Sequence, residues 1–95
     1  MNINNLMQQA QKMQKEYSKK ISEFNDKEFE YNYQNGCVII KMTGALKIIK
    51  LTINKSLIDP DDVITLEEMV SEAINNAIAL ITDKKNDLVP SNGLF

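Results

Sequence analysis

Histidine and arginine are absent from this 95-residue sequence, and cysteine occurs once, as Cys37. Without histidine the chain lacks the commonest general base and the commonest metal ligand of proteins. One cysteine forms neither an internal disulfide nor a thiolate cluster for zinc, and beside Val38 it is typical of a packing residue. A glycine-rich phosphate loop is missing as well. These absences predict that the protein is not an enzyme and uses no metal, cofactor or small-molecule substrate.

Long apolar runs are also missing from the sequence. No stretch approaches the about 18 consecutive apolar residues that a membrane-spanning helix needs, and the N-terminus lacks the layout of a signal peptide. We therefore expect a cytoplasmic protein without a membrane partner. The length fits one domain, predicted to cover residues 1–87. Residues 88–95 carry Pro90 and Gly93 and are expected to form a flexible tail.

The net charge of −2 hides an uneven distribution of charge along the chain. Residues 1–30 carry five lysines and five acids, residues 31–58 carry four lysines and no acid, and residues 59–95 carry two lysines and eight acids. The middle of the chain is therefore basic although the whole is acidic. Because arginine is absent, bidentate recognition of phosphates or guanine edges is excluded.

Two long helices are predicted at the ends of the chain. Over residues 3–24, apolar side chains recur at intervals of three and four and so lie on one helix face. The opposite face carries Gln8, Lys12, Lys15 and Lys19. The second helix is expected to begin near Asp59, either with this residue as its cap or at Thr65 through a capping box. Its predicted buried side chains are Leu66, Met69, Val70, Ala73, Ile74, Ala77 and Ile81.

Between the helices, alternation and turn signals predict a three-stranded antiparallel meander. Asn35-Gly36 is a strong hairpin signal and pairs Tyr33 with Val38. Gly44-Ala45 suits a second tight turn that pairs Ile40 with Ile49 and Val38 with Leu51. The predicted core face of the sheet comprises Phe29, Tyr31, Tyr33, Val38, Ile40, Met42, Ile49, Leu51 and Ile53. The predicted fold class is thus α+β, in the order helix, three strands, helix (α-β-β-β-α).

The outer face of this predicted sheet carries more apolar side chains than a solvated face needs. They are Cys37, Ile39, Leu46 and Ile48. One interpretation is that they are scattered exposed residues, which are common. The other is that a second copy of the chain covers them, which makes them the candidate dimer interface and the protein a homodimer.

Three segments resemble the YbaB/EbfC family of bacterial nucleoid-associated proteins, in the family's order and spacing. They are "NLMQQAQKMQKE" (residues 5–16), "KSLIDPDD" (residues 55–62) and "LEEMVSEAINNA" (residues 66–77). The resemblance extends to about residue 79. It implies a small homodimer shaped like tweezers, whose helical arms bind double-stranded DNA in the nucleoid.

On this resemblance, the candidate DNA-binding residues are the polar face of the first helix and the two lysines that end the second: Gln8, Lys12, Lys15, Lys19, Lys84 and Lys85. The second helix is more acidic than is common in the family, which predicts salt-sensitive binding with little base specificity. The alternative for the lysines is an ordinary solvated helix surface. The alternative for the protein is a dimeric adaptor that binds other proteins and not DNA.

Overall fold

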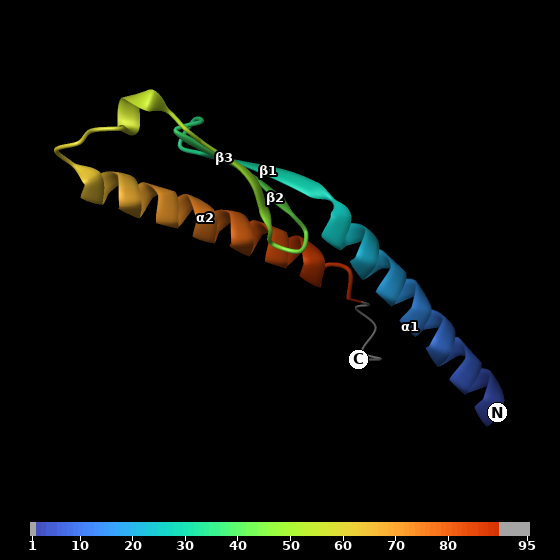
Figure 1. The fold of residues 1–95 in the computed structure, drawn as a ribbon. Helices are drawn as coiled ribbons and strands as arrows, with labels where there is room; N and C mark the ends of the chain where they lie inside the picture. Colours follow the sequence, from blue (N-terminus) through green and yellow to red (C-terminus); the bar gives the residue numbers. More distant parts are fainter. Residues whose placement is uncertain (1, 90–95) are drawn as a thin grey trace.

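The structure is a computed structural model and describes residues 2–89. The chain forms a long helix, a three-stranded sheet, a single turn of 3-10 helix and a second long helix (Figure 1). The bounds are α1 Ile3–Asp26, β1 Glu28–Tyr33, β2 Val38–Thr43, β3 Ile48–Ile53, η1 Lys55–Leu57 and α2 Val63–Asn86. The predicted α+β order is therefore confirmed.

Local hydrogen bonds explain where α1 begins and where it ends. The side chain of Asn2 accepts a hydrogen bond from the backbone N–H of Asn4 at 3.0 Å, which caps the first turn. At the other end Lys27 is extended, and its N–H donates to the carbonyl of Phe24 at 3.1 Å. The chain then runs directly into β1, so the sheet fixes the direction in which α1 leaves the molecule.

The first hairpin has the predicted register. Tyr33 pairs with Val38, and the two strands stay in antiparallel register as far as the pair Glu28 and Thr43. In the turn Asn35 and Gly36 have φ values of 58° and 86°, the left-handed conformations that this residue pair tolerates. Local turn chemistry is therefore sufficient to set this register.

The predicted register of the second hairpin is wrong by two residues. Ile40 pairs with Leu51, and Val38 pairs with Ile53. The turn runs from Thr43 to Leu46, whose N–H donates to the Thr43 carbonyl at 2.9 Å, and Leu46 itself has a φ of 67°. A bulge then interrupts the ladder between Lys41 and Met42. Because the shift is even, the pairs beyond the bulge keep their predicted faces.

Gly44 is required by packing and not by a left-handed turn conformation. A Cβ atom at this position would lie 2.0 Å from the carbonyl oxygen of Phe24 and 2.7 Å from its carbonyl carbon. The N–H of Gly44 also donates to the carbonyl of Lys27 at 2.9 Å. The second turn therefore lies directly against the end of α1, and this contact explains why it departs from the predicted geometry.

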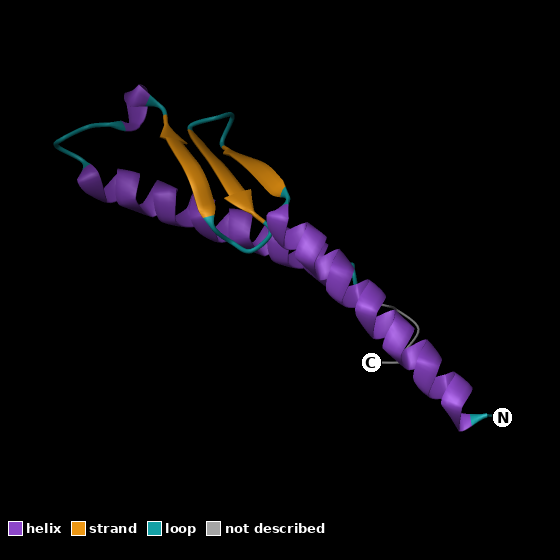
Figure 2. Ribbon diagram, turned by 45° about the vertical axis from the view of Figure 1, so that its right-hand side comes forward, coloured by secondary structure: helices purple, strands orange, loops and turns teal. Residues whose placement is uncertain are grey.

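Helix α2 covers one face of the sheet, packed against β2 and β1 (Figure 2). The buried core comprises Phe24, Tyr33, Val38, Ile40, Met42, Ala73, Ala77 and Ile81. The inner side of β3 remains open, with Ile49 48% and Leu51 39% exposed. A helix is about 10 Å wide and strands are about 4.8 Å apart, so one helix covers about two strands. The prediction that Ile49 and Leu51 lie buried on the core face of the protomer is therefore wrong.

The acidic turn before α2 caps the helix between the two predicted starts, Asp59 and Thr65. The carboxylate of Asp62 accepts the N–H of Thr65 at 3.2 Å, so Asp62 and not Asp59 is the N-cap. Asp59 instead accepts the N–H of Asp61 with its side chain and that of Asp62 with its carbonyl, which closes a turn. At the far end, Leu88 packs against the core, whereas residues 90–95 of the predicted tail lie outside the described residues.

Candidate nucleic-acid interface

The N-terminal part of α1 projects from the core as an arm. Every residue from 2 to 12 is exposed, and the molecule is 71 Å long but only 21 Å by 18 Å across (Figure 1). A 24-residue helix is about 36 Å long, so α1 accounts for much of that length. We call residues 3–19 the arm, so that it includes all the lysines of the predicted polar face. Its geometry places polar side chains where a long partner has unobstructed access to them.

The predicted polar face of the arm is exposed. Gln8, Lys12, Lys15 and Lys19 are all in contact with solvent. Lys15 also lines a shallow surface hollow together with Gln11, Gln14 and Ser18. These three residues are candidates that the sequence analysis omitted. Gln11 and Ser18 lie four residues before and three residues after Lys15, a spacing that would have indicated those two. Lysine ammonium and glutamine amide groups are both donors suited to phosphate oxygens.

Lys84 and Lys85 do not lie on the arm but in the last turn of α2, beside the C-terminal end of α1. The ammonium nitrogen of Lys84 is 5.9 Å from the centre of the Phe29 ring, and that of Lys85 is 5.8 Å from the centre of the Phe24 ring. These two rings pack on each other with centroids 5.1 Å apart. Both lysines therefore take part in cation–π contacts, which join α2 to the start of β1 and to the end of α1 and leave the two lysines less free for phosphate than the arm lysines.

The outward side of α2 is acidic. From residue 63 to residue 83 the helix has no lysine, and its exposed acids include Glu67, Glu68 and Asp83. Glu72 accepts a hydrogen bond of 2.7 Å from the hydroxyl of Tyr33. This hydrogen bond, together with burial, raises the pKa of Tyr33 above its ordinary value. The α2 side of the molecule is therefore unsuited to a polyanion.

The residues predicted to form the dimer interface do not share one face. Ile39 is half-buried on the outer face of the sheet, and Cys37 is half-buried just before β2. Leu46 lies in the turn and is 41% exposed. Ile48 is 46% exposed and pairs through the bulge with Met42, which places it with the inner side of the sheet.

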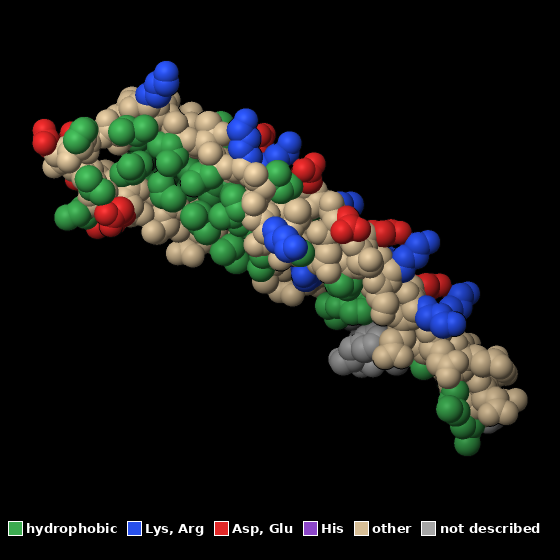
Figure 3. All heavy atoms as spheres, in the orientation of Figure 1, with side chains coloured by type: hydrophobic (Ala, Val, Ile, Leu, Met, Phe, Trp, Pro, Cys, Tyr) green, Lys and Arg blue, Asp and Glu red, His purple; other side chains and the backbone are tan. Residues whose placement is uncertain are grey.

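Exposed apolar side chains gather along β3 instead. We call Leu46, Ile48, Ile49 and Leu51 the β3 patch; their exposed fractions are 41%, 46%, 48% and 39%. Figure 3 shows hydrophobic atoms over β3 and the adjoining part of α2. Near the start of α2 the surface continues with Ile58, Val63 and Ile64, which are 58%, 49% and 68% exposed. An apolar surface of this kind marks an interaction site.

Residues 2–89 lack two other kinds of site. That part of the chain holds no group of three or more histidine, cysteine or acidic side chains arranged to bind a metal ion. None of its helices is both long enough and apolar enough to cross a membrane.

Similar proteins were found both by sequence and by structure. A nucleoid-associated protein of Malacoplasma penetrans is 49% identical over 88 residues, which cover 93% of this chain and 93% of that protein. A nucleoid-associated protein of Streptococcus sanguinis is 39% identical over 83 residues, covering 87% and 84%. A solved but uncharacterized protein of Helicobacter pylori shares the fold, with a TM-score of 0.73 over 93% of this chain and 92% of that one, at 20% identity.

The family assignment follows from the sequence comparisons. The model of the YbaB/EbfC DNA-binding family matches residues 1–90, which include both helices and the whole sheet. The family is defined by DNA binding and not by an enzymatic reaction. With a relative that is 49% identical over almost its full length, this chain is a member of the YbaB/EbfC DNA-binding family.

Proposed function

We propose that this protein is a dimeric nucleoid-associated protein that binds duplex DNA through the phosphate backbone. The observation that carries the proposal is the arm, an exposed helix whose polar face presents Lys12, Lys15 and Lys19 outside the core. The names of its relatives from M. penetrans and S. sanguinis support a place in the nucleoid. Gln8 on the same face adds an amide donor for phosphate oxygens.

Little sequence specificity is expected from these groups. A lysine ammonium acts as a point charge. The bidentate hydrogen bonds that recognise a guanine edge are made mainly by arginine, which the chain lacks. Binding that depends on phosphate neutralisation releases counterions and weakens steeply with salt. Lys84 and Lys85 add positive charge at the base of the arm, but their ring contacts limit what they contribute.

A second copy of the chain is the proposed occupant of the β3 patch. β3 is an edge strand of the sheet, and its inner side lacks a covering helix, so unpaired backbone and apolar side chains occur together there. Leu46 and Ile48 belong to this patch. Cys37 and Ile39, the other predicted interface residues, are already half-buried within the protomer and would add less area. A dimer formed in this way has two arms.

The test is a titration of fluorescently labelled duplex DNA, followed by anisotropy at about 50 and 200 mM salt. Wild-type protein should bind at the lower salt and lose most of its affinity at the higher. Lys12→Gln, Lys15→Gln and Lys19→Gln combined should weaken binding to all sequences alike, and the three Lys→Arg replacements should restore it. Each phosphate contact removed should lower the slope of log K against log salt by about 0.9.

Absence of binding by the wild-type protein at low salt would refute the proposed function. In that case protein partners captured from nuclease-treated lysate would favour the adaptor, for which the acidic outward side of α2 is the natural surface. Binding that is intact in the glutamine variant would instead show that the arm is not the site.

A further inference from the structure

We propose that the outer face of the sheet, centred on Lys41 and Lys50, is a second contact surface for the same DNA duplex. The inference rests on the proposed function and extends the DNA interface from the arm to the body of the protein. The structure places Lys41 on the central strand and Lys50 on an edge strand of the face that α2 leaves open.

The side chains concerned are brought together by strand pairing. Lys41 lies opposite Lys50 on β3 and opposite Glu30 on β1. The three surround a hollow of about 180 Å³ whose other lining residues are Thr52 and Ile39. Lys41, Lys50 and Thr52 are exposed. The hollow therefore offers two ammonium groups and a hydroxyl, all of them donors for a phosphate oxygen.

The charge balance of the hollow itself favours an anion, because its lining includes Glu30 but not Glu28. Like charges directly opposite each other on neighbouring strands destabilise a sheet, and Glu30 supplies only one negative charge against two lysines. Lys50 is on the edge strand, so no further strand of the protomer lies on its other side, and β3 of a second copy would bring no acid there because β3 contains none. A phosphate group between the two ammonium groups would relieve the repulsion. The same segment of chain, residues 31–58, carries four lysines and no acid.

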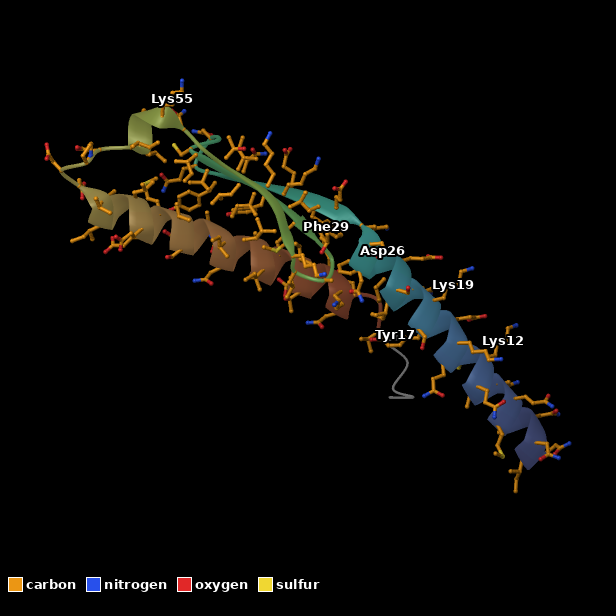
Figure 4. The ribbon with its side chains drawn as sticks, in the orientation of Figure 1. Lys12, Tyr17, Lys19, Asp26, Phe29 and Lys55 are labelled. Carbon is orange, nitrogen blue, oxygen red and sulfur yellow. The ribbon has the colours of Figure 1, made fainter. Side chains whose placement is uncertain are left out.

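The position of this face relative to the arm allows one duplex to reach both. Lys12 and Lys19 on α1 and Lys55 on η1 point along the same edge of the molecule, away from α2 (Figure 4). The acids of α2 lie behind the sheet and repel a polyanion from the other side. The charge distribution therefore orients the protein with the arm and the outer sheet face towards the DNA.

Acidic side chains separate the two groups of lysines. Glu23, Asp26 and Glu28 occupy the junction between α1 and β1. From Lys19 to Asp26 the helix rises about 10 Å, and from Asp26 to Glu30 the extended chain spans at most about 13 Å. Lys41 lies one strand spacing of about 4.8 Å beyond Glu30, so the Cα atoms of Lys19 and Lys41 are at most about 29 Å apart, less than one turn of DNA at about 34 Å. We expect two separate phosphate contacts within one turn.

The experiment compares two charge-removing variants with their charge-retaining controls on a duplex of 24 base pairs. At about 3.4 Å per base pair the 71 Å length of the molecule corresponds to about 21 base pairs, so this duplex spans it. The sheet variant combines Lys41→Gln with Lys50→Gln, and its control combines Lys41→Arg with Lys50→Arg. The arm variant replaces Lys12, Lys15 and Lys19 by glutamine.

The sheet variant should reduce the slope of log K against log salt by about 1.8 per protomer, and its arginine control should keep the wild-type slope. The sheet variant loses the repulsion between Lys41 and Lys50 together with the attraction between Lys41 and Glu30, so it should melt close to the wild type, which verifies its folding. A slope equal to wild type in the sheet variant, with a reduced slope in the arm variant, would overturn the inference and leave the proposed function intact. Failure of the wild type to bind would overturn both.

Discussion

Replacing Gly44 by alanine should destabilise the fold at the point where the arm is attached. The new Cβ would lie 2.0 Å from the carbonyl oxygen of Phe24 and 2.7 Å from both its carbonyl carbon and its Cδ1 atom. Two of these are backbone atoms at the end of α1, which cannot move without shifting the helix. Relief of the overlap would also break the 2.9 Å hydrogen bond from Gly44 to Lys27. Overpacking and a lost buried hydrogen bond together should cost about 3 kcal/mol.

Gly36→Ala is the matched control for this prediction. Gly36 has a φ of 86°, and a Cβ there would be 3.9 Å from its nearest neighbour, so only backbone conformation opposes the change. That cost is about 1–2 kcal/mol. Urea unfolding at one fixed protein concentration gives both free energies, because a dimer's stability depends on concentration. A Gly44→Ala protein as stable as Gly36→Ala, or more stable, would refute the reasoning.

Three further predictions concern the interface and the core. Leu51→Lys should give a folded monomer in light scattering. The control Leu80→Lys should remain dimeric, because Leu80 is equally exposed at 39% but lies on the flank of α2 nearer β1. If both variants are dimers, the β3 patch is not the dimer interface. Because its pKa is raised, Tyr33 should ionise above about 10 in a UV titration, and the stability that it contributes at lower pH should be lost as the pH rises past its pKa. Glu72→Gln should lower the pKa of Tyr33, and an unchanged titration in this variant would contradict the assignment. Ile40 is fully buried, so Ile40→Ala should cost about 2–5 kcal/mol in urea unfolding, and a loss below about 1 kcal/mol would be inconsistent with that burial.

Features determined by neighbouring residues were predictable from the sequence. The periodicity of residues 3–24 predicts α1, and Asn35-Gly36 predicts the first hairpin together with its register. The seven α2 side chains that were predicted to be buried, from Leu66 to Ile81, are also buried or half-buried. In each case the determining interactions lie within one element or one tight turn.

Features determined by tertiary contacts were not predictable. The register of the second hairpin depends on the approach of Gly44 to Phe24, which alternation within the strands does not reveal. Alternation likewise assigns Ile49 and Leu51 to a core, but only the width of a single helix shows that the protomer leaves them open. The exposed position of the arm lysines on one helix face was predicted from the sequence, whereas the pairing of Lys41 with Lys50 depends on the corrected register.

The separation of the arm from the core has a consequence for local stability. An isolated helix of this length is marginal in water, and most helical stability in proteins comes from packing of the apolar face. In the arm that face is open, with Ile3 71% and Met7 57% exposed. Its backbone amides should therefore exchange with deuterium far sooner than those around Ile40. Ordering of the arm would then offset part of the favourable free energy when a ligand binds to it.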